Sequence, residues 1–110
     1  MKKIKLFPLH DIDSTKEFWS GTKLRVLNVG MNVDDKSEDY YDYILAYASW
    51  ESESMMIVNI TDNNSKAGSV YGGVIPIRTD LGRAVVTKAG FQHTLGKGLK
   101  DWYLIIEEYE

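Results

Sequence analysis

Cysteine is absent from this chain of 110 residues, and its absence excludes several classes of protein. Without thiols there can be no disulfide scaffold, thiolate zinc site, iron–sulfur cluster or thiol nucleophile. Histidine is scarce as well, because His10 and His93 are the only two imidazoles. Nothing in their spacing brings both to one phosphate, so we do not expect the histidine pair of an acid–base nuclease.

Sequence motifs for phosphate, metal and acyl chemistry are also missing. Gly96-Lys97-Gly98 lacks the spacing of a phosphate-binding loop, and no Gly-x-Ser-x-Gly nucleophile motif occurs. The acids between residues 34 and 39 lack the alternation and the glycine of an EF-hand loop. We therefore expect no catalytic residue, no cofactor and no metal site, and we expect that the protein is not an enzyme.

A long hydrophobic run is the third absence. The apolar stretches are a handful of residues long, whereas a helix that crosses a bilayer needs about 20. The start, Met1-Lys2-Lys3-Ile4-Lys5, lacks the apolar stretch of a secretory signal peptide. We expect a cytoplasmic protein that does not associate with membranes.

An excess of basic residues is missing too. The chain has 13 Lys and Arg against 16 Asp and Glu, a net charge of −3, which is the wrong sign for a protein that binds the phosphate backbone. A basic group near the N-terminus, with Phe7 and Trp19 available for stacking on bases, is opposed by the acidic middle of the chain. We therefore do not expect a nucleic-acid partner.

What the sequence does contain is strand-forming residues. With 44% hydrophobic and 12% aromatic residues, the chain can form one domain, residues 1–110, with its own core. Period-two alternation and turn residues predict the following elements. The expected strands cover residues 3–6 at a sheet edge, 22–33, 41–50 as a central strand, 55–61 and 70–77 as a hairpin, 83–86 and 101–109, and the expected short helices cover residues 13–19 and 87–95.

These elements predict an α+β fold that is predominantly β. We expect a single-domain antiparallel sheet, or a partly open barrel or sandwich, of five to seven strands with one or two short helices. Alternation places Leu45 on a face with three tyrosines and groups Ile105 with Tyr103, and we expect Leu45 and Ile105 to be core residues. Gly72-Gly73 indicates either a β-bulge or a place where another backbone or a ligand comes close.

The charges are unevenly distributed along the chain. Residues 1–33 have a net charge of +3, residues 34–53 have −6, and residues 54–110 have zero. The acidic middle is interleaved with tyrosines. Acidic side chains speed association with a basic partner, and tyrosines supply a large contact area at low entropy cost. Solvated loop acids and half-buried strand tyrosines would explain the same pattern without a partner.

We predict that this segment binds another protein. The expected partner-binding residues are Asp34, Asp35, Glu38, Asp39, Tyr40, Tyr41, Asp42, Tyr43 and Trp50. In size, acidity and lack of cysteines and catalytic motifs, the profile is similar in type to the immunity proteins of bacterial toxin systems, although no diagnostic motif supports a family assignment. The expected partner is therefore a basic protein such as a cognate toxin, for example a nuclease, whose active-site cleft the acids would occupy as phosphate mimics.

Two alternatives stay open at this point. The first is a β domain that binds a small ligand or carbohydrate, with a concave site lined by Trp19, Trp50, Trp102 and Gly72-Gly73. The second is a homo-oligomer formed by pairing of edge strands near Pro8 or Tyr109.

Overall fold

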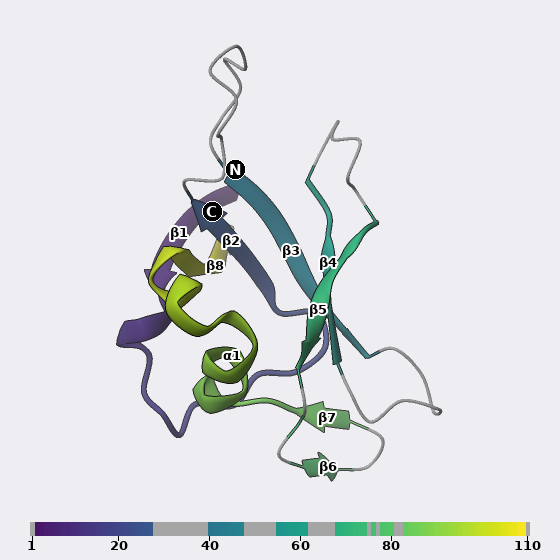
Figure 1. Cartoon of the computed structure of the whole chain (residues 1–110). Helices are drawn as coiled ribbons and strands as arrows, with labels where there is room; N and C mark the ends of the chain where they lie inside the picture. Colours follow the sequence, from purple (N-terminus) through teal and green to yellow (C-terminus); the bar gives the residue numbers. More distant parts are fainter. Residues whose placement is uncertain are drawn as a thin grey trace.

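The fold is built on an antiparallel sheet with one helical segment against it (Figure 1). The computed structural model describes residues 2–27, 40–47, 55–61, 68–74, 76, 78–80 and 83–109. The strands of the large sheet are β1 (Lys2–Pro8), β2 (Lys23–Leu27), β3 (Tyr40–Tyr47), β4 (Met55–Asn59), β5 (Val70–Val74) and β8 (Trp102–Tyr109). The remaining elements are η1 (Leu9–Asp11), β6 (Arg78–Asp80), β7 (Arg83–Val85), α1 (Lys88–Leu95) and η2 (Gly96–Asp101).

The order of the strands confirms the predicted fold class. The six-stranded sheet has the order β1-β8-β2-β3-β4-β5, with every neighbouring pair antiparallel. As predicted, β1 lies at an edge, β3 is interior, and β4 and β5 pair as a hairpin. The strands β6 and β7 form a separate two-stranded ribbon. The final strand β8 is not an edge strand, because it lies between β1 and β2.

One face of the sheet carries the core. Along β2 and β4 every second residue is buried, as a one-sided sheet requires. Leu24, Leu45, Met55 and Ile57 are fully buried on the side that α1 covers. The prediction that Leu45 is a core residue is therefore confirmed. The same prediction for Ile105 is wrong, because Trp102 and Leu104 take the inward positions of β8 and Ile105 is only half-buried.

A pair of glycines lets the helix approach β5. The register between β4 and β5 shifts at Ile57/Val58, which is a β-bulge. A Cβ atom on Gly72 would lie 3.4 Å from Cγ2 of Thr94 on α1, and the Thr94 hydroxyl donates to the carbonyl of Gly73 at 2.8 Å. The bulge interpretation is supported, with the extra residue at Tyr71 directly before the pair, whereas the group that comes close to Gly72 is a side chain, Thr94 of α1, and not another backbone or a ligand.

The predicted helix at residues 13–19 is absent. Asp13 instead accepts hydrogen bonds from the backbone N–H and the hydroxyl of Thr15, which closes a turn. Phe18 then forms an isolated β-bridge with Val86 and is buried against Phe91 of α1, with ring centroids 5.4 Å apart. Burial of Phe18 requires an extended chain here. The predicted helix at residues 87–95 is confirmed as α1.

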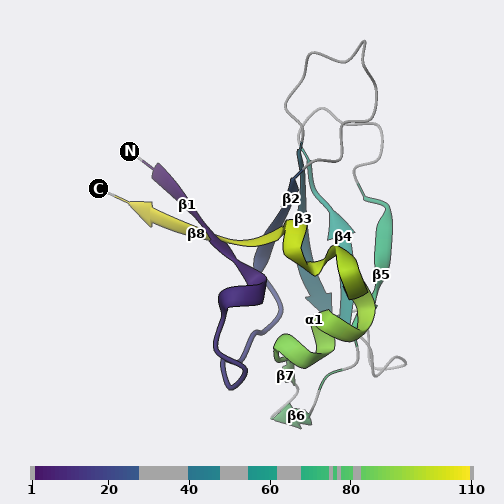
Figure 2. The same cartoon turned by 60° about the vertical axis from the view of Figure 1, so that its left-hand side comes forward.

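The strands β1 and β8 extend beyond the rest of the sheet and form a two-stranded ribbon there. β8 pairs with β2 only through residues 102–104, whereas it pairs with β1 from Tyr103 to Tyr109. Figure 2 shows this ribbon projecting away from β2, β3, β4 and β5, with both chain termini at its tip. Among the described residues, no helix is long and apolar enough to cross a membrane.

Candidate functional site

The structure describes part of the predicted partner-binding segment. Asp34, Asp35, Glu38, Asp39 and Trp50 lie outside the described residues. Tyr40, Tyr41, Asp42 and Tyr43 all belong to β3. Because side chains alternate along a strand, these four residues are divided between the two faces of the sheet.

On the face away from the helix, Asp42 and Tyr40 hold Arg25. The Arg25 Nε and Nη2 atoms donate to the two carboxylate oxygens of Asp42 at 2.7 and 3.1 Å. The guanidinium carbon lies 3.9 Å from the centre of the Tyr40 ring. The side chains of Arg25 and Asp42 are only 17% and 22% exposed. Asp42 therefore neutralises a cation of its own chain.

On the helix side, Tyr43 belongs to a cluster of three aromatic rings. The Tyr43 ring centroid lies 5.0 Å from that of Trp102 and 5.9 Å from that of Tyr71, and Tyr71 and Trp102 are 5.2 Å apart. Tyr43 and Trp102 are buried, whereas Tyr71 is 51% exposed. Because Tyr43 is buried, its role is to form the wall of a site and not an exposed contact.

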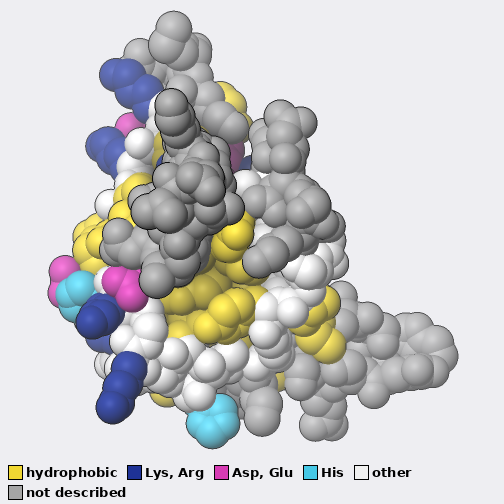
Figure 3. Space-filling model, turned by 45° about the horizontal axis from the view of Figure 1, so that its top comes forward, with side chains coloured by type: hydrophobic (Ala, Val, Ile, Leu, Met, Phe, Trp, Pro, Cys, Tyr) yellow, Lys and Arg dark blue, Asp and Glu magenta, His cyan; other side chains and the backbone are white. Residues whose placement is uncertain are grey.

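These rings border a cavity of about 290 Å³, which we call the aromatic hollow. Its described lining residues come from β2, β3, β5, η2 and β8 and are Val26, Leu27, Tyr41, Tyr43, Tyr71, Gly98, Asp101 and Trp102. When the top of Figure 1 is turned forward, described hydrophobic side chains gather near the centre of the view (Figure 3). Because Val26, Leu27 and Tyr41 line it, the hollow lies at the end of the sheet where β2 ends and β3 begins.

Sequence reasoning missed Tyr71 and Asp101 as site residues. Tyr71 has no partner in the β4–β5 register, since Val58 pairs with Val70 and Ile57 pairs with Gly72. This bulge turns the Tyr71 ring toward Trp102. The aromatic residue directly before Gly72-Gly73 was the available signal. Asp101 ends η2 immediately before β8, and nothing in its sequence context marked it.

The electrostatics of the hollow come from one carboxylate and the buried phenol. Asp101 is half-buried, and no other described side chain pairs with it. Burial raises the pKa of Tyr43, with smaller contributions in the same direction from Tyr41 and Tyr71 and an opposing hydrogen bond from Asn59. The phenol therefore stays neutral, and the described charge at the hollow is negative.

The acidic segment is joined to the sheet beside the hollow. Leu27, the last residue of β2, is paired with Tyr40, the first residue of β3. Residues 28–39, with Asp34, Asp35, Glu38 and Asp39, connect these two positions. Leu27 and its neighbour Val26 line the hollow, and so does Tyr41. The acidic segment thus leaves and re-enters the sheet at the rim of the hollow.

The residues expected for a ligand-binding site are only partly together. Trp102 lines the aromatic hollow, and Gly72-Gly73 follow Tyr71 on β5. Trp19 is not among the described lining residues of the hollow, and its 44% exposed side chain lies on the connection between η1 and β2. Trp50 lies outside the described residues. The structure therefore gives Trp102 tyrosine neighbours in place of Trp19.

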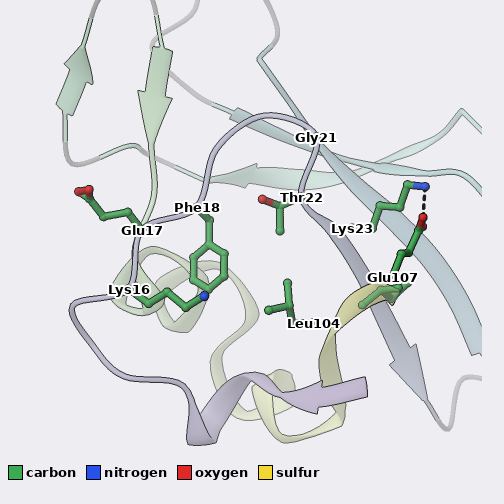
Figure 4. Close-up of a pocket in the computed structure, with 9 residues that line it drawn as sticks. Lys16, Glu17, Phe18, Gly21, Thr22, Lys23, Leu104 and Glu107 are labelled. Atoms are coloured by element: carbon green, nitrogen blue, oxygen red, sulfur yellow. Dashed lines mark hydrogen bonds and ion pairs between the residues drawn. The ribbon is translucent and has the colours of Figure 1, made fainter. Parts of the chain in front are cut away.

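A second cavity, of about 390 Å³, lies where β8 leaves β2 (Figure 4). Phe18, Leu104 and Ile105 contribute apolar surface to it. Lys23 donates to Glu107 at 2.8 Å across one side, and this hydrogen bond raises the pKa of Lys23. Because Lys23 and Glu107 already neutralise each other, they are less available to bind a ligand in this cavity than the Asp101 carboxylate is in the aromatic hollow.

Comparison of the chain with protein-family models, with curated protein sequences and with solved structures finds no match. Within the described ranges, no group of three or more His, Asp and Glu side chains is placed to hold a metal ion. The site must therefore be interpreted from its own residues.

Proposed function

We propose that this protein is an inhibitor of the immunity type, which binds a basic bacterial toxin, for example a nuclease, and covers its active-site cleft. It would act in the cytoplasm. The observation that supports the proposal is the Leu27–Tyr40 pair, where the two ends of the acid-rich connection, residues 28–39, join the sheet beside the aromatic hollow. A connection rich in acids whose two ends, at Leu27 and Tyr40, join the sheet beside a recess lined by aromatic rings would combine electrostatic steering with an anchoring site.

The described residues refine the role of each part of the predicted surface. Asp42 neutralises Arg25, so attraction for the partner falls to Asp34, Asp35, Glu38 and Asp39. Tyr43 is buried, so the accessible aromatic surface at the hollow is provided mainly by Tyr71. A nuclease must keep its cleft positive to hold nucleic acid, and a surface of opposite charge is complementary to it.

A salt-dependent pull-down from lysate of the source cells tests this proposal. We expect the tagged protein to retain one basic protein in near-equal stoichiometry, less of it at high salt, and to inhibit that protein's activity. The variant Asp35→Lys/Glu38→Lys should lose most of this retention, because reversing charges at an interface slows association.

The matched control is Asp11→Lys/Glu108→Lys, which changes the net charge by the same amount. Both carboxylates are exposed, at 58% and 47%, and contact only exposed partners, so the fold should tolerate their loss. Equal retention of the partner by the two double variants would contradict the proposal.

A domain that binds a small ligand or carbohydrate is the second candidate, because Tyr and Trp rings line the hollow. Its volume of about 290 Å³ is at the lower limit for a small-molecule pocket, which favours a single side chain as occupant. A saturable change in tryptophan fluorescence with a free sugar or metabolite, in the absence of any protein partner, would favour this candidate.

A further inference from the structure

We propose that the aromatic hollow binds one cationic side chain, an arginine or a lysine, that projects from the protein partner. This inference rests on the proposed inhibitor function and names the chemistry that its site recognises. The cation would lie against the Tyr71 and Trp102 rings and pair with the carboxylate of Asp101.

The composition of the hollow favours a cation over other occupants. Aromatic ring faces attract cations through their quadrupole, most strongly where water is excluded. Asp101 has no described partner, so an anionic group would be repelled by it. An apolar side chain would remove water from the carboxylate without replacing its hydrogen bonds, which is costly. Only a cation gains from both the rings and the carboxylate.

The opposite face of the same strand already contains this arrangement. There the Tyr40 ring and the Asp42 carboxylate together hold the guanidinium of Arg25, with Nε at 2.7 Å from the carboxylate and the guanidinium carbon 3.9 Å from the ring centre. The hollow presents tyrosine and aspartate without a described cation. The hollow could therefore bind a cationic side chain of a partner with the same pair of groups, an aromatic ring and a carboxylate, that binds Arg25.

An NMR titration with N-acetyl-arginine amide tests the site without the partner. The matched probe is N-acetyl-citrulline amide, which has nearly the same shape but no charge. We expect saturable shifts of the Tyr71, Gly98 and Trp102 resonances, with an arginine affinity in the millimolar range and at least about 3-fold above that of citrulline. Asp101→Asn should remove this preference, and Tyr71→Leu should weaken binding of arginine.

The control variant is Glu108→Gln, which removes an exposed carboxylate on β8 that pairs with Lys5 and should leave the titration unchanged. Amide spectra of each variant report whether the fold is kept. Equal affinity for the two probes, shifts confined to other surfaces, or an unchanged preference in Asp101→Asn would overturn the proposed cation site.

The pull-down separates this inference from the function on which it rests. If Asp101→Asn and Tyr71→Leu keep the partner at full strength while Asp35→Lys/Glu38→Lys releases it, the protein is an inhibitor and the cation site is wrong. If the arginine probe binds as expected and no protein is retained, the cation site stands and the inhibitor function is wrong.

Discussion

Leu45 and Ile105 are aliphatic side chains of similar size that lie on opposite faces of one sheet. Leu45 is fully buried on the helix side, and Ile105 is half-buried on the other side. We expect Leu45→Ala to lower the free energy of unfolding by about 2–5 kcal/mol, because it leaves a cavity in the core. Ile105→Ala should cost roughly 1 kcal/mol, since the space it leaves is open to water. Urea denaturation of both variants measures the difference, and equal losses would contradict the assignment of faces.

Tyr43 predicts a dependence of stability on alkaline pH. Burial raises its pKa above the ordinary value of 10.0, so the phenol ionises more readily in the unfolded chain than in the folded protein. The stability that this group contributes is complete below pH 10.0 and is lost as the pH rises through the higher folded pKa. Unfolding measured across this range should show a smaller alkaline loss in Tyr43→Phe than in the wild type.

The matched control for that experiment is Tyr109→Phe. A hydrogen bond from the Tyr109 hydroxyl to Glu107 raises the pKa of this exposed tyrosine, so Tyr109→Phe measures how much of the alkaline loss comes from a raised pKa without burial. An alkaline loss of stability that is the same in Tyr43→Phe and the wild type would show that burial of Tyr43 is not its cause.

At the residue scale, the sequence predicted correctly which side chains share a face of a strand, but it did not predict which of them are exposed to solvent. Period two correctly placed Tyr41, Tyr43 and Leu45 on one face of β3, because alternation is a property of the backbone. That Tyr43 is buried depends on Trp102, which is distant in sequence and reaches it only through the β2–β8 pairing. Tyr71 contacts Trp102 because a β-bulge turns its ring to the helix side of the sheet. The Gly-Gly pair indicated where the bulge lies but not which side chain it would turn.

At the scale of elements, the contact between α1 and β5 depends on Gly72. A Cβ atom there would be at 3.4 Å from the Thr94 methyl group, which is the limit of ordinary contact. We expect Gly72→Ala to change the free energy of unfolding by less than about 1 kcal/mol. Gly72→Leu should cost roughly 1–3 kcal/mol or more, because a larger side chain must displace the helix. Thermal unfolding of the two variants tests this, and comparable stability would show that the helix can move freely.

The two predicted helices show where local sequence is sufficient and where it is not. Both segments contain residues that can cap a helix, and in both the apolar side chains follow the helical repeat only weakly. Residues 87–95 form a helix because Phe91 and Leu95 can both be buried from one helical face. Residues 13–19 do not, because Phe18 reaches the core as an extended residue bridged to Val86. Tertiary burial therefore decided between two similar local patterns.

At the scale of the whole molecule, β1 shields one edge of β8. Deleting residues 1–8 would leave the backbone of β8 unpaired beyond residue 104 on both sides, since β2 pairs only with residues 102–104. Unpaired strand edges associate with one another. We expect the truncated protein to be less stable and to show an apparent mass in light scattering that rises more steeply with concentration than that of the full chain, because a second edge of β8 is left unpaired. A monomeric truncated protein of unchanged stability would contradict this.

The pairing of β1 with β8 also constrains how the protein is made. Lys2 and Tyr109 are neighbours in the finished sheet, and the register between them joins opposite ends of the sequence. During synthesis β1 leaves the ribosome long before β8, the strand that it pairs with in the described sheet, and β2 likewise waits for β8, one of its two described neighbours. A nascent chain can close the β3–β4–β5 part early, but the six-stranded sheet is completed only once residues 102–109 have been made and have emerged.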